Sequence, residues 1–443
     1  MLTAIIICFI VGYLIIVFEH PLRLDKTVPA LIMGALCWAF VSYGHLDVVN
    51  AEHELGHIDE VLLHHIGKVA EILIFLIGAM TIVELIDLHK GFAVITNKIK
   101  TTKKSTLLWI LGFLAFFLSA TLDNLASTIV LVSLLRRLVP DKKERLWFVS
   151  MAVIAANAGG AWSPIGDVTT TMLWIGKKVS TGGLISHLVL PSIICMVVPF
   201  FVASLMKPFK GQITSDPNEE GRGRSSKEKL LSSSTMLYVG IGALVFVPVF
   251  KTITHLPPYV GMMLALGVVW LVSEYINPEE ELEDDRKHLY SAHQALSRIE
   301  MSSILFFLGI LMAVAALESV AVMYNGHETG LLMYLAELMQ AAIPNQNLVV
   351  LILGGLSAII DNVPLVAASM GMYTKPMDDS LWHFIAYSAG TGGSMLIIGS
   401  AAGVAAMGME RINFIWYVKN VTWLAFLGFI SGAGVFIVMQ SFF

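Results

Sequence analysis

Two Asp-Asn pairs stand in strongly apolar surroundings. Asp123-Asn124 follows the stretch LSATL, and Asp361-Asn362 follows the similar stretch LSAII after an offset of 238 residues. Carboxylate and amide oxygens are ligands for hard cations. A buried carboxylate without a cation must find another partner or take up a proton. These residues therefore support reversible binding of a hard cation or a proton, with helix N-capping as the alternative role for each Asp.

Two glycine-rich segments supply further oxygen atoms. Residues 156–171 read ANAGGAWSPIGDVTTT, and residues 389–400 read AGTGGSMLIIGS. Glycine and proline weaken or break a helix, and unpaired backbone at membrane depth is tolerated only inside protein or beside water. The freed carbonyls and neighbouring side chains can surround Na⁺, Li⁺ or a proton, whereas an oxygen-only ligand set does not suit soft transition metals.

The expected site combines the two pairs with the two breaks. Asp123, Asp167 and Asp361 are expected to carry the charge and to exchange the proton. Neutral oxygens, or groups that orient the carboxylates, are expected from Ser119, Asn124, Asn157, Thr169, Thr170, Ser357, Asn362 and Ser394.

Composition indicates the elements that must position these residues. Of 443 residues, 56% are hydrophobic and 14% charged, with a net charge of −5. A soluble domain carries roughly 25% charge, so an ordinary soluble enzyme, a disordered protein and a nucleic-acid binder are excluded. Runs long enough to cross a lipid bilayer predict an all-α polytopic membrane protein. Full spans are expected over 2–18, 28–43, 68–87, 146–176, 186–206, 234–250, 257–275, 301–320, 380–410 and 414–440.

Two other apolar stretches, 105–138 and 347–374, are too long for one simple crossing, and each has Asp-Asn near its middle. If both are re-entrant hairpins that enter from opposite faces, 23 of the 28 Lys and Arg residues fall on one side. The positive-inside rule makes that side cytoplasmic. Both termini are then expected outside, in the periplasm of a bacterium whose inner (plasma) membrane holds the protein.

The two halves of the chain are similar to each other. GGAWSPIGD at 159–167 and GGSMLIIGS at 392–400 match with an offset of 233, close to that of the Asp-Asn pairs. Two matches in the same order indicate a duplication, and hairpins from opposite faces make the repeats inverted. Inverted repeats with broken helices predict a secondary transporter with its site at the midplane. Two unrelated glycine-rich packing faces are the less favoured alternative.

The repeat divides the chain into six parts. They are first-repeat scaffold helices at 1–104, first-repeat transport elements at 105–185, a connecting span and cytoplasmic linker at 186–233, second-repeat scaffold helices at 234–346, second-repeat transport elements at 347–413 and the last span at 414–443.

The charges inside the apolar segments are acidic. Carboxylates such as Asp123, Asp167 and Asp361 lie there, and no Lys or Arg is expected well inside those segments. The partners that remain are a transported cation and H⁺. Replacing one by the other is the basis of antiport, and no resident cofactor is needed.

A rival motif lies near the N-terminus. His53-Glu54-Leu55-Gly56-His57 matches the H-E-x-x-H pattern of zinc proteases. It stands in a polar amphipathic stretch without a convincing third ligand, so a surface helix leading into the span at Lys68 is the favoured interpretation.

Four segments carry a resemblance to a known family. They read GAMTIVELID (78–87), SATLDNLASTIV (119–130), NAGGAWSPIGDVTTTMLW (157–174) and SAIIDNVPLVAA (357–368). Together they resemble the NhaD family of sodium/proton antiporters, which is related to sodium-coupled dicarboxylate carriers and arsenite pumps. The resemblance implies exchange of Na⁺ or Li⁺ for H⁺, an elevator-type mobile domain, a homodimer and a role for Glu84. A sodium-coupled anion transporter is the alternative, but dicarboxylate carriers have Ser-Asn-Thr where this chain has Asp-Asn.

Overall fold

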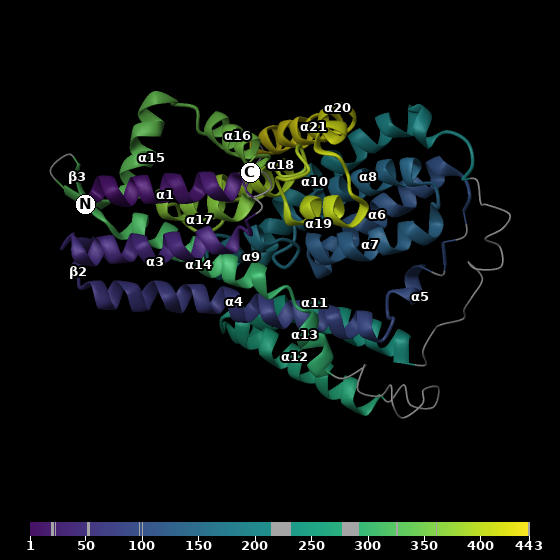
Figure 1. Cartoon of the computed structure of the whole chain (residues 1–443), viewed down its shortest axis with the longest axis horizontal. Coiled ribbons are helices and arrows are strands. Elements are labelled where there is room, and N and C mark those ends of the chain that lie inside the picture. Colours follow the sequence, from purple (N-terminus) through teal and green to yellow (C-terminus); the bar gives the residue numbers. More distant parts are fainter. Residues whose placement is uncertain are drawn as a thin grey trace.

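The computed structural model describes residues 1–18, 22, 24–50, 54–96, 98–99, 101–213, 232–276, 292–324, 327–359 and 361–441. Within these ranges the chain is mostly helical (Figure 1). The elements of the first half are α1 (Leu2–Val17), α3 (Thr27–Tyr43), β1 (Val48–Val49), β2 (Leu55–Gly56), α4 (Ile58–Leu88), α5 (Ala93–Thr96), α6 (Lys104–Leu122), α7 (Asn124–Leu138), α8 (Lys142–Gly160), α9 (Val168–Ile175), α10 (Thr181–Leu205) and the 3-10 helix η1 (Lys207–Phe209). Those of the second half are α11 (Ser232–Thr254), α12 (Pro258–Tyr275), α13 (Ala292–Arg298), α14 (Met301–Ser319), β3 (Ala321–Tyr324), β4 (His327–Gly330), α15 (Leu331–Ala342), α16 (Gln346–Ser357), α17 (Asn362–Met372), α18 (Ser380–Gly392), α19 (Ala401–Glu410), α20 (Phe414–Asn420) and α21 (Thr422–Gln440).

The helix lengths are those of a multi-pass membrane protein. Among the described residues, seven helices are long and apolar enough to cross a bilayer, or up to eight if the pair α15 and α16, bent by 116°, is one span. Helices α1 and α3 are apolar but shorter, at 16 and 17 residues. Three features differ from the sequence expectation. Helix α4 begins at Ile58 rather than at residue 68, the last span is interrupted at Val421, and the β3–β4 hairpin with α15 follows α14.

Both stretches with Asp-Asn pairs fold as helical hairpins. Helices α6 and α7 meet at Asp123, and α16 and α17 meet near Asp361. Asp123 adopts a left-handed backbone with φ of 95°, and its Oδ1 accepts the Ala126 N–H at 2.7 Å. Asp361 Oδ1 accepts the Val363 N–H at 3.3 Å. Each Asp therefore serves as an N-cap, the alternative role that the sequence left open.

Both glycine-rich segments interrupt a helix. Helix α8 ends at Gly160 and α9 begins at Val168, while α18 ends at Gly392 and α19 begins at Ala401. The N-cap residues of α9 and α19 are Asp167 and Ser400, which are equivalent under the offset of 233.

Glycine is required where the first half of each broken helix crosses a hairpin. A Cβ at Gly159 would lie 2.1 Å from the Phe116 carbonyl oxygen, and a Cβ at Gly392 would lie 2.2 Å from that of Gly354. The two glycines match under the sequence offset of 233, and Phe116 and Gly354 match under the offset of 238. The same close backbone approach therefore occurs in both halves.

Gly159→Ala should destabilise the protein by about 1–3 kcal/mol, because the added methyl group overpacks this crossing. Gly267→Ala is the matched control, since a Cβ at this position in α12 meets no atom within 4 Å. Its effect should be neutral or stabilising by up to about 1 kcal/mol. Thermal unfolding of the purified variants measures both, and equal melting temperatures would contradict the close approach.

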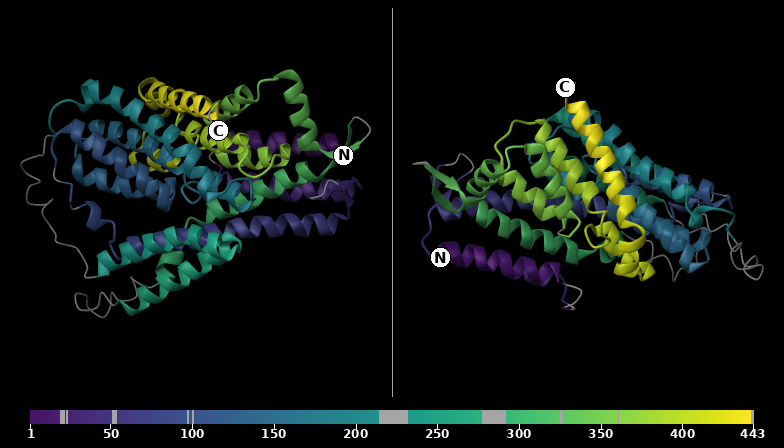
Figure 2. Two further views of the ribbon diagram at one scale, coloured as in Figure 1. Left: turned by 180° about the vertical axis from the view of Figure 1, so that it is seen from behind. Right: turned by 90° about the horizontal axis from the view of Figure 1, so that it is seen from above.

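Each broken helix packs on both hairpins. Helix α8 contacts α6 and α7, and α9 contacts α17; reciprocally, α18 contacts α16 and α17, and α19 contacts α7. Figures 1 and 2 show α6, α7 and α8 in one half of the long axis and α1, α3 and α17 in the other. Helix α9 lies between the two groups (Figure 1).

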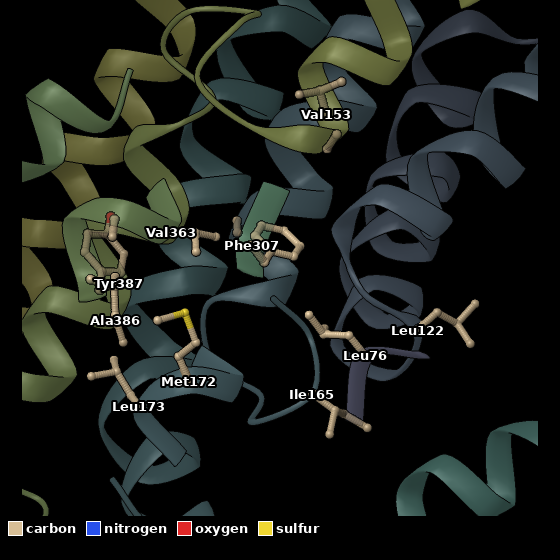
Figure 3. Packing of buried hydrophobic residues seen from close by; sticks show 14 of the residues in the cluster. Leu76, Leu122, Val153, Ile165, Met172, Leu173, Phe307, Val363, Ala386 and Tyr387 are labelled. Atoms are coloured by element: carbon tan, nitrogen blue, oxygen red, sulfur yellow. The ribbon is translucent and has the colours of Figure 1, made fainter. Parts of the chain in front are cut away.

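Apolar side chains fill the region around α9. Figure 3 shows Met172 and Leu173 of α9 among Val363 of α17, Phe307 of α14 and Leu76 of α4, and all five are buried. Close packing of this kind is the main source of helix association in a bilayer. The remaining helices pack mainly as α1 and α14 on α3, α12 on α4 and α11, and α10 on α21.

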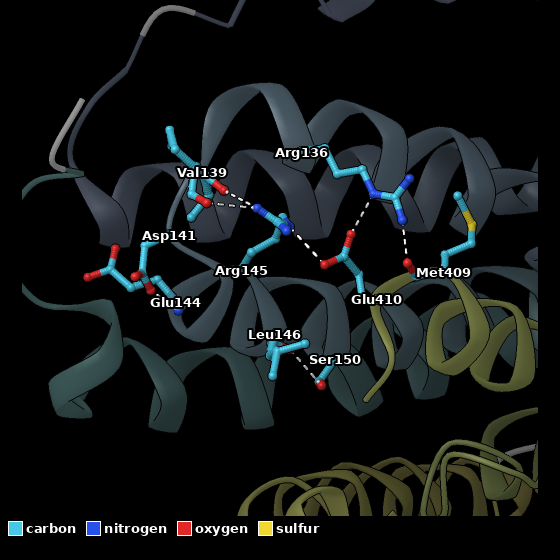
Figure 4. Close-up of polar contacts among 10 residues, drawn as sticks. Arg136, Val139, Asp141, Glu144, Arg145, Leu146, Ser150, Met409 and Glu410 are labelled. Atoms are coloured by element: carbon cyan, nitrogen blue, oxygen red, sulfur yellow. Dashed lines mark hydrogen bonds and ion pairs between the residues drawn. The ribbon is translucent and has the colours of Figure 1, made fainter. Parts of the chain in front are cut away.

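An ion cluster fixes one end of the hairpin α6–α7 (Figure 4). Glu410 at the end of α19 accepts hydrogen bonds from Arg136 Nε at 2.7 Å and Arg145 Nε at 2.9 Å. Arg136 also donates to the Met409 carbonyl oxygen, and nearby Lys104 pairs with Glu144. Since Arg136 is on α7, Arg145 on α8 and Glu410 on α19, the cluster joins the first half of the chain to the second.

Candidate functional site

Asp167 lies at the centre of a buried polar network. Asp167 is 2% exposed, and it directly precedes α9 at the end of the first helix break. Its Oδ1 accepts the Thr169 N–H at 2.8 Å and the Thr169 hydroxyl at 2.7 Å. Asp167 is the N-cap of α9, and its side-chain oxygen satisfies an N–H group that has no partner within the helix. The helix N-terminus also favours negative charge.

The tips of both hairpins reach this carboxylate. Asn124 Nδ2 donates to Asp167 Oδ2 at 2.5 Å, and Asn362 Nδ2 lies 3.4 Å from both of its oxygens. The asparagine of each Asp-Asn pair, rather than the aspartate, therefore contacts the central carboxylate. Together with Thr169, the two amides surround Asp167 with hydrogen-bond donors.

The network continues to the second break. Asn124 Nδ2 also donates to Asn157 Oδ1 at 3.1 Å, and Asn157 Nδ2 donates to Ser400 Oγ at 2.9 Å. Ser400 Oγ in turn accepts the Gly403 N–H at 3.1 Å. A chain of hydrogen bonds thus links the N-termini of α9 and α19. Its carboxylate, amide and hydroxyl groups are those that bind a hard cation.

The other hydroxyl residues have mainly positioning contacts. Ser119 donates to the Ala156 carbonyl at 2.6 Å, and its repeat equivalent Ser357 donates to the Ala389 carbonyl at 2.8 Å. Each ties a hairpin tip to its broken helix. Thr170 donates to the Asp167 backbone carbonyl at 2.9 Å. Ser394 donates to the Thr391 carbonyl at 2.6 Å, and its described contacts do not join it to the network.

Asp123 and Glu84 lie beside a cavity instead. The cavity has a volume of about 850 Å³ and is bounded by α4, α7, α14 and α19, among other elements. Asp123, Glu84 and Lys26 line it, together with Asp87 and Arg298. The side chains of Asp87 and Arg298 are 56% and 46% exposed, and their charged atoms are 4.0 Å apart. The cavity therefore joins an exposed ion pair to Glu84 on α4 and to Asp123 at the first hairpin tip.

The expectation that the deep carboxylates have no basic partner is wrong for Asp361. Lys26 Nζ lies 2.9 Å from Asp361 Oδ2. Lys26 is the N-cap residue of α3, at the edge of an expected span, and its long side chain reaches inward. Sequence reasoning missed this contact, because the two residues are 335 positions apart and carry no shared local pattern.

The described part of the zinc-protease motif, residues 54–57, is not helical, so the surface helix expected for this stretch is wrong there. Leu55–Gly56 is a strand paired with Val48–Val49, and α4 begins only at Ile58. His53 lies outside the described residues, while Glu54 is exposed. Metalloproteases of this kind need both histidines on one helical face. In the described parts of the chain, no group of three or more His, Cys, Asp or Glu is arranged to hold a metal ion.

Comparisons with known proteins agree with the membrane architecture. A solved structure of Neisseria gonorrhoeae MtrF, described as one of a class of antimetabolite efflux pumps, superposes with a TM-score of 0.53. The match covers 93% of each chain at 11% sequence identity. It therefore supports a shared fold and nothing more specific.

Sequence comparisons are more specific. The profile of the citrate transporter family matches residues 13–382. Sodium/proton antiporter 1 of Arabidopsis thaliana is 46% identical, with 99% of this chain and 73% of the relative covered. Na⁺/H⁺ antiporter NhaD of Alkalimonas amylolytica is 28% identical, with 98% and 89% covered. These relatives are named transporters rather than enzymes. The chain therefore belongs to the citrate transporter family, in its group of sodium/proton antiporters.

Proposed function

We propose that this protein exchanges Na⁺ or Li⁺ for H⁺ across a membrane. The observation that carries the proposal is the convergence of both hairpin tips on the buried Asp167. The relatives named sodium/proton antiporters support the same function. Binding of a cation to Asp167, with Asp361 at the second hairpin tip as a further carboxylate ligand, or of a proton in place of the cation, would be the exchange step.

Two polar asparagines make this competition possible. A carboxamide can present either its N–H groups or its oxygen after rotation. With Na⁺ bound, Asn124 and Asn362 would turn their oxygens toward the cation, and Thr169 and Asn157 would orient the ligands. With H⁺ bound, Asp167 would itself become a donor. Both loaded states neutralise the carboxylate.

The cost of moving the ionised Asp167 carboxylate without a bound ion explains why Na⁺ and H⁺ movements would be coupled. A charged carboxylate at the bilayer centre costs at least about 2.5–3.5 kcal/mol. The mobile domain would therefore cross readily when Na⁺ or H⁺ is bound and rarely when the site is empty. If the mobile domain crosses with Na⁺ bound in one direction and with H⁺ bound in the other, each full cycle exchanges one ion for the other.

Recurring contacts support an inverted repeat with an elevator-type mobile domain. The tie from Ser119 to Ala156 recurs as the tie from Ser357 to Ala389. The mobile domain would comprise the transport elements at 105–185 and 347–413, joined by the ion pairs of Glu410 with Arg136 and Arg145. The scaffold would comprise 1–104 and 234–346, with 186–233 as connector and 414–443 as the last span. The family resemblance further implies a homodimer, for which light scattering of the purified protein is the test.

Contacts at the two ends support the proposed topology. Arg136 and Arg145, which belong to the 23 basic residues expected on the cytoplasmic side, meet at Glu410. On the other side, the backbone carbonyl oxygen of Lys178, one of the five basic residues expected outside, accepts the Asp378 backbone N–H at 2.9 Å. The cavity that carries Asp123 would then open toward the cytoplasm at Arg298, an inward-facing arrangement. Both termini would be external; a bacterial plasma membrane is proposed, with a plant membrane as the alternative raised by the Arabidopsis relatives.

A pH-gradient assay in inverted membrane vesicles tests the proposal. Addition of NaCl or LiCl should dissipate an imposed pH gradient, as reported by recovery of a quenched fluorescent probe. The same vesicles with and without citrate test the anion-transporter alternative. Proton movement that requires citrate, and none with Na⁺ or Li⁺ alone, would contradict the antiporter function.

Glu54→Gln should leave Na⁺-driven proton movement within about twofold of wild type, because surface substitutions away from a site are usually close to neutral. Glu54 is exposed and distant in sequence from every residue of the proposed site. The pH-gradient assay measures this. Complete loss of transport in this variant would instead favour a function for the His-Glu motif.

A further inference from the structure

The position of Lys26 is fixed from two sides. Its Nζ is 2.9 Å from Asp361 Oδ2 and 4.5 Å from the centroid of the Phe306 ring on α14. The side chains of Lys26 and Asp361 are 23% and 14% exposed. Partly buried ion pairs are screened less by salt than exposed pairs. The ammonium is therefore an effective counter-ion for this carboxylate.

Both oxygens of Asp361 are engaged in this arrangement. Oδ1 accepts the Val363 N–H at the start of α17, and Oδ2 accepts the hydrogen bond from Lys26. A cation that coordinated Oδ2 would meet the ammonium at contact distance, and like charges repel strongly there. Cation binding at Asp361 and pairing with Lys26 therefore exclude each other.

The ion pair joins two different parts of the fold. Helix α3 packs on α1 and α14, whereas Asp361 caps α17 of the second hairpin. The next residue, Asn362, contacts Asp167. Lys26 thus connects α3 to a hairpin tip that belongs to the central network.

We propose that Lys26 is a built-in counter-ion that holds Asp361 while the site lacks Na⁺, and that Na⁺ loading displaces its ammonium from Oδ2. The inference rests on the proposed function and adds a positioning residue to it. Once displaced, the ammonium remains beside the cavity that Asp123 and Glu84 line. Displacement would release the second hairpin from α3, so that cation loading and domain release occur together.

Among the described residues, other charged and titratable groups lie around the pair, and Glu84, Asp123 and Glu300 line the same cavity as Lys26. Tyr13 of α1 and Asp167 interact electrostatically with Asp361. Asp25 precedes Lys26 and is exposed; hydrogen bonds from the Thr27 side chain and backbone hold the pKa of Asp25 below its ordinary value. Asp25 therefore stays ionised at neutral pH and is not a proton acceptor for Lys26.

Na⁺ binding to the purified full-length protein tests this proposal. The apparent Kd comes from the Na⁺ dependence of the melting temperature, and KM and kcat come from Na⁺-driven proton movement in proteoliposomes. Lys26→Met should lower the Kd for Na⁺ about tenfold or more, because Na⁺ no longer competes with a positive charge at contact distance. The KM should fall in parallel.

Three further variants separate the counter-ion role from a structural one. Lys26→Arg keeps the charge and should restore a Kd within about threefold of wild type. Lys90→Met removes a charge from the lining of the same cavity and should leave the Kd within about twofold. In an Asp361→Asn background, Lys26→Met should no longer change the Kd, since coupled residues lose their individual effects in a double-mutant cycle.

The proposal is overturned if Lys26→Met binds Na⁺ with a Kd within twofold of wild type, or if Lys90→Met lowers the Kd as much. Should Lys26→Met not purify as folded protein, Lys26→Gln takes its place with the same expectations. A wild-type protein that moves no protons with Na⁺ would refute the proposed function itself. A wild-type exchanger with unchanged Kd in the Lys26 variants would refute only the counter-ion.

Discussion

Asp167→Asn should reduce Na⁺-driven proton movement more than a hundredfold. The substitution removes the one charge at the centre of the buried network, while the chain of amides from Asn124 to Ser400 remains. In this variant a bound Na⁺ would be a buried charge without its carboxylate partner, which costs about 3–5 kcal/mol. Each 1.4 kcal/mol is a tenfold change in affinity. The pH-gradient assay with NaCl and LiCl measures the loss.

The variant should still fold, because asparagine is as good an N-cap as aspartate. The side-chain oxygen can continue to accept the Thr169 N–H. Asp141→Asn is the matched control: Asp141 caps α8 on the exposed surface and accepts the Glu144 N–H at 2.8 Å. It should retain wild-type transport. Wild-type exchange in Asp167→Asn would remove Asp167 from the proposed site.

Glu410→Ala should have the largest effect on stability, about 2–4 kcal/mol. The Glu410 side chain is 1% exposed and forms ion pairs with two arginines. Breaking a buried pair by removing one partner costs about 3–5 kcal/mol, and the lower range applies because Arg136 is 47% exposed. Loss of the cluster would separate α19 from α7 and α8 at one end (Figure 4). Thermal or denaturant unfolding in detergent measures the change.

Glu337→Ala provides the control for that experiment. Glu337 is exposed on α15, and its removal should change stability by no more than about 0.5 kcal/mol. Glu410→Gln should fall between the two, since it keeps a hydrogen-bond acceptor but loses the charge. Equal stability of Glu410→Ala and wild type would show that the cluster does not hold α19 against α7 and α8.

The breaks and hairpins could be predicted because their signals are local. Gly159, Gly160 and Pro164 disfavour helix wherever they stand, and the structure has its first break at 161–167. The duplicated pattern made the second break near Gly393 predictable in the same way. The strand pair β3–β4 was missed, although Asn325-Gly326 in the sequence is a local signal for a hairpin turn. Helix α15 lacked such a signal, because 331–342 carries neither a repeat match nor an apolar run long enough for a span.

The contacts within the site could be predicted only in part. The sequence marked Asp123, Asp167 and Asp361 as one set, but the structure joins Asp167 to the two asparagines and leaves Asp123 beside the cavity. Whether the Asp or the Asn side chain of a pair points toward Asp167 depends on the backbone angles at the hairpin tip. One example is the positive φ of Asp123. The pairing of Lys26 with Asp361 depends on tertiary packing across most of the chain.

Uptake of ²²Na⁺ into proteoliposomes that contain only the purified wild-type protein is the most direct test of exchange. An outward-directed proton gradient, with the membrane potential clamped and no organic anion present, should drive Na⁺ above its equilibrium level. Collapsing the proton gradient should abolish that accumulation. Na⁺ uptake that is the same with and without the proton gradient, or that occurs only when citrate is added, would contradict sodium/proton antiport.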